Sequence, residues 1–535
     1  MLTKNFAYAC LTEKCELGLG AQVALHWINN DLTAVDYTYQ DFEDSSNQLA
    51  NVLAGFDIQA GEVVSIFLPR SEQLISAFFA IQKLQAMSCI LFSTLGEEAM
   101  LDRLENSGAR VVITKKSLLR KVLAIKDALP QLKAILVIDL DAHQGGQVYS
   151  LPQLLSEAGT GFDYQHYVDP ETPAFLQYTS GSTGKPKGAL HVHGGLAEMQ
   201  QTIGEIMIIE PGDLYWCTAD PAWITGLVYG IILPFSLSIR QLQFSGGYNA
   251  EKWMQILDDQ GVNTWYTAPT ALRMLMQEGE FTFSKHAFAA LKHIYSVGEP
   301  LNPEIFHWGK KTFQKEIYDT WFQTETGCIM IANKPGLVVK PGSMGKPRAG
   351  IEIRICDDEV KPVPVGKQGY LTLRAGWGSM FRTYFQKDKE YQDKFRQGFY
   401  FTGDLAKQDE DGYVWYISRS DDVINTAGHL VGPFEVESAL LEIEEVSDVA
   451  VIGVPDELLH QKIIAFLVLR PGETWEKALE LKCRIHVSNK VSSFAMPSDF
   501  VITDKIPKNQ SGKILRRVLK AQYDGTDAGD LSTME

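Results

Sequence analysis

A short stretch rich in hydroxyl groups, glycines and lysines carries the strongest chemical signal in this chain. Residues 178–188 contain four Ser or Thr side chains, three glycines and two lysines, with little bulk. Backbone N–H groups and hydroxyls of such a loop surround phosphate oxygens, and lysine supplies positive charge. It is not a Walker loop, because Gly181 and Gly184 are too close together and Pro186 stands where that motif has Ser or Thr. This stretch alone also suits a plain surface turn.

Further polar residues are expected where two strands end. Residues 298–300 (Gly-Glu-Pro) follow one apolar stretch, and residues 322–327 follow another that carries Asp319. In open α/β sheets, ligands bind at the carboxyl ends of the strands. Glu325 suits a Mg²⁺ ligand as well as an ordinary turn carboxylate. Trp321 suits a surface on which a base stacks, or a core position.

Three charged residues in the C-terminal half suit nucleotide chemistry, and each has a plain alternative. Asp404 follows a glycine turn and suits either the two hydroxyls of a ribose or a structural cap. Arg419 has the planar, forked donor set that binds phosphate or ribose, or that forms a surface ion pair. Lys513 lies in a Ser-Gly-Lys turn and, taken alone, reads as a solvated lysine.

The elements that would position these residues alternate between strand and helix. A helix is expected over residues 72–83, and residues 191–195 lead into a helical pattern after the loop. Such alternation indicates parallel sheets covered by helices on both faces. The expected strands are 63–69, 110–114, 134–139, 174–178, 264–267, 293–297 and 316–321.

The pattern changes from about residue 345. Apolar and polar residues alternate at 351–355 and 370–374, which is typical of half-exposed antiparallel strands. The polar stretch 418–422 suits a hinge, and a compact unit of about a hundred residues follows it. Within that unit we expect helices at 433–444 and 476–487 and strands at 449–454 and 463–469.

Composition narrows the class of protein. The 535 residues are 45% hydrophobic and carry a formal net charge of −17. We therefore expect a globular protein of several domains, with no nucleic-acid or membrane partner. The most apolar run, at 226–235, is shorter than the about 20 residues that a bilayer requires. The seven cysteines include no CxxC pair, which favours a reduced, cytoplasmic protein without a metal cluster.

Taken in order, these motifs resemble the superfamily of acyl- and aryl-CoA synthetases, luciferases and peptide-synthetase adenylation domains, and most closely its AMP-forming acetyl-CoA synthetases. The resemblance extends from about His26 to Arg517. The matching segments are 178–188, 220–226, 266–270, 296–300, 319–327, 400–404, 419–422 and 506–513.

The resemblance implies an α/β fold with two domains. The large N-terminal domain, residues 1–420, would hold two stacked, helix-flanked sheets and a β-barrel-like subdomain. A small, mobile α+β C-terminal domain would follow over residues 421–520, with a flexible tail over 521–535.

The resemblance also implies a two-step reaction. A carboxylate attacks the α-phosphate of Mg-ATP, giving an acyl-adenylate and pyrophosphate, and the thiol of coenzyme A then displaces AMP. Catalytic roles fall on Lys513, Thr179 and Glu325, with Glu325 holding Mg²⁺. The implied ATP-binding residues are Thr179, Ser180, Gly181, Ser182, Thr183, Gly184, Lys185, Gly298, Glu299, Pro300, Asp319, Thr320, Trp321, Gln323, Thr324, Asp404 and Arg419.

In this scheme Lys513 bridges the acid and the α-phosphate and neutralises the charge that develops in the transition state. It lies on the small domain, so it acts only when that domain is docked in one way. The hinge for the change of orientation maps onto Asp421. Acetylation of Lys513 would remove its charge, which makes a lysine acetyltransferase and deacetylase candidate partners.

Acid choice is expected to depend on Phe322. The implied pocket consists of Trp223, Ile224, Thr225, Val297 and Phe322. Relatives that take bulky acids have glycine at the position of Phe322, and acetyl-CoA synthetases have tryptophan. A methylene group or two is discriminated by only about 1–3 kcal/mol. We therefore expect acetate, with propionate, short branched acids and medium-chain acids as alternatives.

Two positions depart from the family pattern. Leu430 stands where relatives have an arginine that assists phosphate binding, and Ser488 falls near the position of an arginine that meets coenzyme A. Arg103 matches an N-terminal residue of the coenzyme A site. Two alternatives therefore stay open, an adenylating enzyme that loads a carrier protein and a weakly catalytic protein that binds nucleotide.

Overall fold

The fold is taken from a computed structural model, which describes residues 2–179, 186–279, 283–427, 429–456, 458–508 and 514–526. Residues 180–185 of the predicted phosphate loop and the predicted catalytic Lys513 lie outside the described residues.

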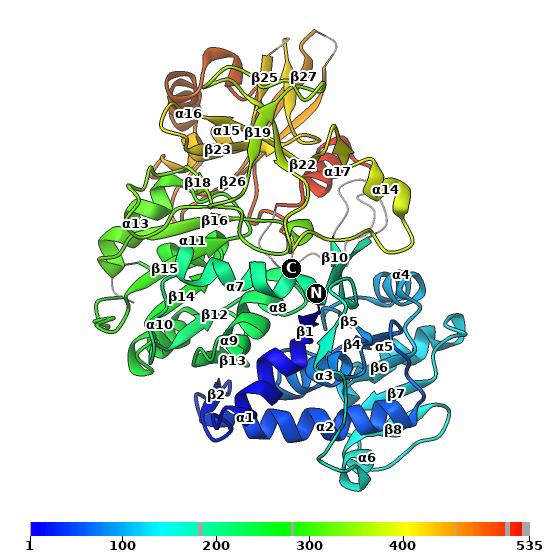
Figure 1. The fold of residues 1–535 in the computed structure, drawn as a ribbon. Coiled ribbons are helices and arrows are strands. Elements are labelled where there is room, and N and C mark those ends of the chain that lie inside the picture. The colour runs from blue at the N-terminus through cyan, green and yellow to red at the C-terminus, as the bar shows by residue number, and fades with distance from the viewer. Residues whose placement is uncertain are drawn as a thin grey trace.

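A seven-stranded sheet forms the part of the molecule that lies on the right in Figure 1. Its order is β11-β10-β5-β4-β6-β7-β8, and all neighbours are parallel except β10 and β11. The strands are β4 (Val63–Ile66), β5 (Met87–Ile90), β6 (Val111–Thr114), β7 (Ala134–Val137), β8 (Val148–Ser150), β10 (Pro173–Thr179) and β11 (Lys187–Val192).

A nine-stranded sheet forms the neighbouring part, in the order β18-β17-β16-β15-β14-β12-β13-β2-β3. The six strands from β16 to β2 run parallel, and antiparallel strands close both edges. The strands are β2 (Val23–Ile28), β3 (Ala34–Thr38), β12 (Tyr215–Cys217), β13 (Gln241–Phe244), β14 (Thr264–Thr267), β15 (His293–Val297), β16 (Ile317–Trp321), β17 (Ile331–Ala332) and β18 (Lys346–Pro347).

Helices cover these sheets and pack with them in several apolar core clusters. The helical segment from Ile224 to Ser236 is buried throughout and packs against residues of both sheets, which accounts for the apolar run in the sequence. Within the described residues, no helix is both long and apolar enough to cross a bilayer. The main helices are α2 (Tyr39–Gly55), α3 (Glu72–Lys83), α4 (Glu97–Ser107), α5 (Lys116–Ile125), α7 (Leu196–Glu205), α10 (Ala250–Asp259), α11 (Pro269–Gln277) and α13 (Pro303–Phe313).

Two smaller sheets follow along the chain. The first is antiparallel and joins β19 (Ile353–Cys356), β20 (Gly369–Arg374), β21 (Phe395–Arg396), β22 (Phe399–Gln408) and β23 (Val414–Arg419). The second lies at the top of Figure 1 and belongs to the C-terminal domain, defined here as residues 424–526. This domain contains β24 (Ile424–Thr426), β25 (His429–Val431), α15 (Pro433–Leu441), β26 (Val446–Asp456), β27 (His460–Leu469), α16 (Lys477–Lys490), β28 (Asp499–Ile502) and α17 (Arg516–Asp524).

The predicted fold class is confirmed, and residues 191–195 lead into a helix as expected, because the short 3₁₀ helix His193–Gly195 is followed by α7. One strand beside the loop was not predicted. The chain first returns as β11, which pairs with β10 from Thr179–Lys187 to Pro173–Val192. β10 and β11 therefore form a β-hairpin, with Thr179 and Lys187 paired at its end. β11 is itself the edge strand of the sheet, and four of its six residues are buried, so it lacks the alternation of a half-exposed strand.

Candidate functional site

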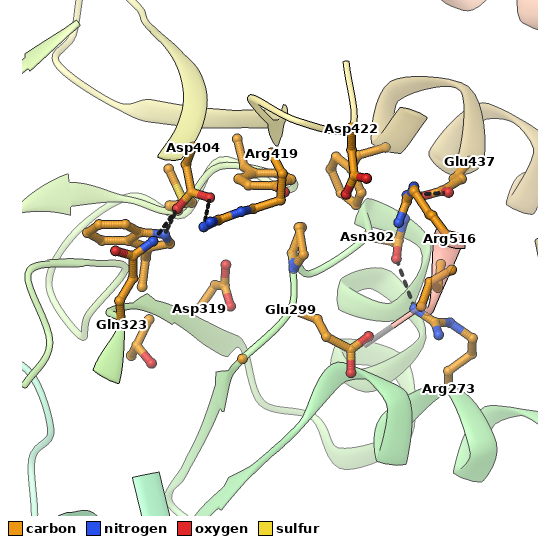
Figure 2. Close-up of a pocket in the computed structure, with 18 of the residues that line it drawn as sticks. Arg273, Glu299, Asn302, Asp319, Gln323, Asp404, Arg419, Asp422, Glu437 and Arg516 are labelled. Atoms are coloured by element: carbon orange, nitrogen blue, oxygen red, sulfur yellow. Dashed lines mark hydrogen bonds and ion pairs between the residues drawn. The ribbon is translucent and has the colours of Figure 1, made fainter. Parts of the chain in front are cut away.

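A cavity of about 220 Å³ lies between the large domain and the C-terminal domain (Figure 2). The carboxyl ends of β15 and β16 form its floor, as expected for an α/β sheet. The predicted site residues that line it are Gly298, Glu299, Pro300, Asp319, Thr320, Trp321, Phe322, Gln323, Asp404 and Arg419. Segments far apart in the sequence therefore meet around one cavity.

Asp404 is the centre of a polar cluster at one end of this cavity. Its Oδ2 accepts hydrogen bonds from Trp321 Nε1 at 3.1 Å and from Gln323 Nε2 at 3.0 Å. Its Oδ1 accepts one from Arg419 Nη1 at 2.8 Å, and Asp404 and Arg419 face each other on the paired strands β22 and β23. Gly403 precedes it with a φ of +80°, where a Cβ would lie 2.8 Å from Arg419 Nη2. The cluster fixes a buried carboxylate beside an arginine, an arrangement suited to a diol or a phosphate.

Asp319 lies on the cavity floor, in β16. The hydroxyl of Ser296, on the neighbouring β15, donates to Asp319 Oδ1 at 2.7 Å. Burial raises the pKa of Asp319 to about 7, although this hydrogen bond opposes the shift. Near neutral pH the carboxyl group is therefore partly protonated, and its protonated form can donate a hydrogen bond as well as accept one.

Glu299 lies beyond the turn at Gly298, whose φ of +94° favours glycine. Thr270 Oγ1 donates to Glu299 Oε2 at 2.9 Å, while Glu299 Oε1 is buried and has no hydrogen-bond partner among the described residues. Burial raises the pKa of Glu299, and the positive charges of Arg273 and Lys508 oppose this shift. A buried acceptor beside a cavity is a group that a ligand donor can satisfy.

The base of the phosphate loop is tied to the turn that carries Thr324 and Glu325. His191 of β11 donates through Nε2 to the Thr324 carbonyl at 2.8 Å, and burial lowers the pKa of His191 to about 4, so the imidazole is neutral. Tyr384 OH donates to Glu325 Oε1 at 2.6 Å, and Lys187 Nζ lies 5.3 Å from the centre of the Tyr384 ring. The hairpin and the predicted Mg²⁺ ligand thus belong to one connected group.

Thr179 ends β10 and pairs with Lys187 at the neck of the hairpin. Its Oγ1 lies 3.5 Å from the Lys187 carbonyl oxygen, which it contacts as a weak hydrogen-bond donor. Because Lys187 also faces Tyr384, the predicted catalytic Thr179 lies on the same side of the hairpin as the group around Glu325.

The predicted acid-pocket residues separate into two places. Phe322 lines the cavity, and its ring packs 5.4 Å from that of Tyr229, which is fully buried. Ile224 and Val297 belong to the same apolar cluster as Phe322, and Thr225 is buried between Ile224 and Gly226 in α8 (Ile224–Leu227).

Trp223 lies elsewhere, beside a much smaller cavity that Arg103 and Tyr178 also line. The Arg103 side chain is buried, its Nη1 donates to the Ala99 carbonyl at 2.6 Å, and its guanidinium lies 5.9 Å from the Tyr178 ring centre. The structure therefore places the predicted coenzyme A residue near the base of the phosphate loop, apart from the main cavity.

The C-terminal domain supplies a wall that sequence reasoning missed. Arg516 Nη2 donates to Glu437 Oε1 at 2.5 Å, and both residues line the cavity (Figure 2). Ile514, the residue after Lys513, lines it as well. Arg273, Asn302 and Asp422 are further lining residues that were not predicted. The position of Arg273, four residues after the Ala-Pro motif at 268–269, was the available signal.

The predicted hinge residue Asp421 lies two residues after the end of β23, in the connection from the large domain to β24. Its Oδ1 is 3.9 Å from Arg419 Nε, so the hinge position is next to the cluster around Asp404.

Comparisons with known proteins agree with this geometry. Residues 20–385 match the family of AMP-binding enzymes, and residues 435–513 match the AMP-binding enzyme C-terminal domain. The acetyl-coenzyme A synthetase of Bacillus subtilis is 40% identical over 99% of this chain and 92% of its own length. That of Pyrobaculum arsenaticum is 32% identical over 99% of this chain and 85% of its own.

Among solved structures, the anthranilate CoA ligase AuaEII in complex with anthranoyl-AMP superposes with a TM-score of 0.89 at 27% identity, covering 98% of each chain. The cavity between a large and a small domain thus defines an adenylate-forming class of protein. The chain belongs to the AMP-binding enzyme family.

Proposed function

We propose that the protein is an AMP-forming acetate–CoA ligase, which converts acetate, ATP and coenzyme A into acetyl-CoA, AMP and pyrophosphate. One observation carries the proposal. Nine of the predicted nucleotide-binding residues line a single cavity together with Phe322, and its far wall includes Ile514, the residue next to Lys513. The full-length likeness to acetyl-coenzyme A synthetases supports the same conclusion.

In the first step an acetate oxygen forms a bond to the α-phosphorus of ATP, and the bond from that phosphorus to the leaving pyrophosphate breaks. Asp404, with Arg419 beside it, takes the ribose hydroxyls, and the floor around Trp321 and Asp319 takes the base. Lys513 offsets the negative charge shared by the acetate and the α-phosphate, which develops further in the transition state. The hairpin loop holds the pyrophosphate as it leaves.

In the second step the sulfur of coenzyme A attacks the acetyl carbonyl carbon, and the bond to AMP breaks. The chain turns about Asp421 between the steps, so that Lys513 withdraws and the thiol reaches the adenylate. On this basis we propose the boundary between the two domains at residues 420 and 421, and α17 extends the C-terminal domain to Asp524. Ser488 falls near the position where relatives have an arginine that meets coenzyme A, and it carries no charge. We therefore assign a part in coenzyme A binding to Arg103, which lies near the base of the loop.

Mg²⁺ enters as part of the ATP substrate. Within the described residues, no three His, Cys, Asp or Glu side chains converge on a metal site. Glu325 offers one carboxylate beside the base of the phosphate loop, and Mg²⁺ is commonly held by one or two carboxylates together with substrate phosphates and water. The residues present therefore fit a metal that ATP carries, and Glu325 would hold it there while Mg²⁺ neutralises phosphate charge.

Acetate is favoured over longer acids because two aromatic rings close the apolar end of the cavity. Phe322 forms the wall, and Tyr229 stands behind it, fixed by hydrogen bonds at 3.0 Å from Ile329 N and with Thr202 Oγ1. Phe322 is smaller than tryptophan, so propionate is the next best substrate, at a discrimination of about 1–3 kcal/mol for each methylene.

The test is an assay of purified protein with ATP, Mg²⁺ and acids of two to six carbons, with and without coenzyme A. We expect acetate to give AMP and a thioester only when the thiol is present. Adenylate formation without transfer to coenzyme A would favour a carrier-protein substrate instead. No pyrophosphate with any acid would overturn the proposal.

A further inference from the structure

The C-terminal domain contacts the large domain through a small set of polar side chains beside the cavity. Gln277 Nε2 donates to the Ser447 carbonyl at 3.0 Å, and Asn302 Nδ2 donates to Ser438 Oγ at 2.9 Å. Between these contacts lies Asp448, the residue after Ser447 in β26. These contacts place a carboxylate of the C-terminal domain at the centre of the domain interface.

Asp448 has cations on two sides. Its Oδ2 is 2.6 Å from Lys508 Nζ, and its Oδ1 is 3.9 Å from Arg273 Nη1 of the large domain. The three side chains are 9 to 16% exposed. Such a site screens charges poorly, so loss of Asp448 removes a carboxylate that both cations face.

Arg273 is itself held in place. Its Nη2 donates to Asn302 Oδ1 at 3.3 Å (Figure 2), and Asn302 in turn bonds to Ser438 of α15. Arg273 and Asn302 of the large domain are therefore linked to each other, and each contacts the C-terminal domain, at Asp448 and Ser438 respectively. Both Arg273 and Asn302 line the cavity.

Lys508 lies at the base of the segment that contains Lys513. Residues 508 and 514 face each other in an antiparallel bridge, and Leu515 N donates to the Pro507 carbonyl at 2.9 Å. The two ends of the segment are therefore held together. Ile514 lines the cavity, so an interaction that holds Lys508 in place also holds Ile514 at the cavity wall.

From this geometry we propose that Lys508, Asp448 and Arg273 form an ionic clasp that positions Lys513 for the adenylation step. The inference rests on the proposed function. Lys508 and Asp448 belong to one domain and move together, whereas Arg273 belongs to the other. Any rotation of the C-terminal domain therefore separates Asp448 from Arg273. The clasp exists in the orientation seen here and is absent in the orientation required for thiol transfer.

Asp448→Asn in the full-length protein tests this, because Asp448 does not line the cavity. Two half-reactions are measured: acetate-dependent exchange of labelled pyrophosphate into ATP, and formation of acetyl-CoA from supplied acetyl-adenylate and coenzyme A. We expect the exchange rate to fall at least about tenfold while thioester formation stays within about twofold. An equal fall in both, or no fall in either, would overturn the clasp.

Three further variants, Asp448→Glu, Lys508→Met and the double variant Lys508→Met with Asp448→Asn, distinguish positioning from loss of folding. Asp448→Glu keeps the charge and is expected to recover much of the exchange rate. The double variant should lower the exchange rate no further than Lys508→Met or Asp448→Asn alone, because the two residues act through one interaction. Additive losses, or no recovery in Asp448→Glu, would contradict the clasp.

Lys407→Met is the matched control. Lys407 of β22 pairs with Glu435 of α15 across the same domain interface at 3.2 Å, but both side chains are about one-third exposed. We expect both half-reactions to stay within about twofold, as is usual for exposed pairs. If Lys407→Met slowed pyrophosphate exchange as much as Asp448→Asn while sparing thioester formation, a specific clasp would be contradicted.

The two proposals fail in different ways. If the unaltered protein shows no pyrophosphate exchange, the proposed function fails. If it shows exchange, and Asp448→Asn affects both half-reactions equally or neither, only the clasp fails.

Discussion

The large domain and the C-terminal domain each supply one wall of the cavity, but they hold their charged groups in different ways. On the large-domain wall, Asp404 accepts hydrogen bonds from three side chains of the same domain. On the opposite wall, Glu437 and Arg516 pair within the C-terminal domain, and only a few contacts such as that of Asp448 with Arg273 cross between the walls.

We propose that this difference separates nucleotide recognition from chemistry. The cluster around Asp404 is held by residues of the large domain alone, whereas Glu299 Oε1 has no hydrogen-bond partner among the described residues. The C-terminal wall adds Ile514 and Arg516, which lie close to Lys513 in the sequence. We propose that the protein binds its nucleotide with one domain and controls the reaction with the other.

The largest effect should come from the C-terminal wall. Lys513→Ala removes the charge that stabilises the adenylation transition state, and we expect acetate-dependent pyrophosphate exchange to fall by about 10²–10³-fold or more. Formation of acetyl-CoA from supplied acetyl-adenylate should change little. Lys477→Ala, at an exposed position of the same domain, is the control. Exchange that persists in Lys513→Ala would refute the assigned role.

A change on the large-domain wall should weaken binding instead. Asp404→Ala removes a charged hydrogen-bond acceptor worth about 1.5–3 kcal/mol, so KM for ATP should rise roughly 10- to 150-fold while KM for acetate changes little. Steady-state kinetics measure both. Asp411→Asn, whose side chain is exposed and paired with Lys340, should leave both unchanged. A rise confined to KM for acetate would contradict this assignment, because it would show that Asp404 acts on the acid and not on ATP.

At the apolar end, Phe322→Gly should open the cavity toward Tyr229. We expect kcat/KM for butyrate relative to acetate to rise by about tenfold or more, in line with 1–3 kcal/mol for each methylene. Phe288→Leu is the control for loss of packing elsewhere in the protein, because Phe288 lies in a separate core cluster. We expect it to leave the preference for acid length unchanged. The same chain-length profile in the folded Phe322→Gly variant would show that this ring does not set acid size.

The smallest effect concerns stability. Asp319 binds its proton more tightly in the folded state, where its pKa is about 7, than in the unfolded chain, where it is near 4. The folded state is therefore favoured by protonation, and stability falls as pH rises toward 7 and then levels off. Between pH 6 and 8 the wild type should lose about 1–1.5 kcal/mol relative to Asp319→Asn, which cannot ionise. Urea unfolding at both pH values measures this, and parallel pH dependence in the two proteins would contradict it.

Much of the scaffold could be predicted because local patterns and tertiary structure agree. The helix expected at 72–83 and the strand expected at 293–297 have the observed bounds. β11 was missed because its residues carry no distinctive alternation, and its pairing with β10 is set by tertiary contact. In contrast, the hydroxyl groups, glycines and lysines at 178–188 form a distinctive local pattern, which is the basis of the predicted phosphate loop.

The distinction between local sequence patterns and tertiary contacts applies to the site as well. Asp404 and Arg419 were predictable because each stands in a short motif, and the structure brings them together. Glu437, Arg516 and Asp448 were not, because each lies within an ordinary helix or strand pattern and only the folded protein places them beside the cavity or the domain interface. The sequence therefore indicates the nucleotide-binding motifs more readily than the side chains at the interface between the domains.

The central claim is that one domain binds ATP and the other supplies the catalytic charge. The most direct test is the dissociation constant of ATP, measured by calorimetry without acetate, for Lys513→Ala, Asp404→Ala and the unaltered protein. We predict that Lys513→Ala binds ATP within about fivefold of the unaltered protein, and that Asp404→Ala binds it roughly 10- to 150-fold more weakly. Loss of ATP binding in Lys513→Ala as large as that in Asp404→Ala would contradict the separation.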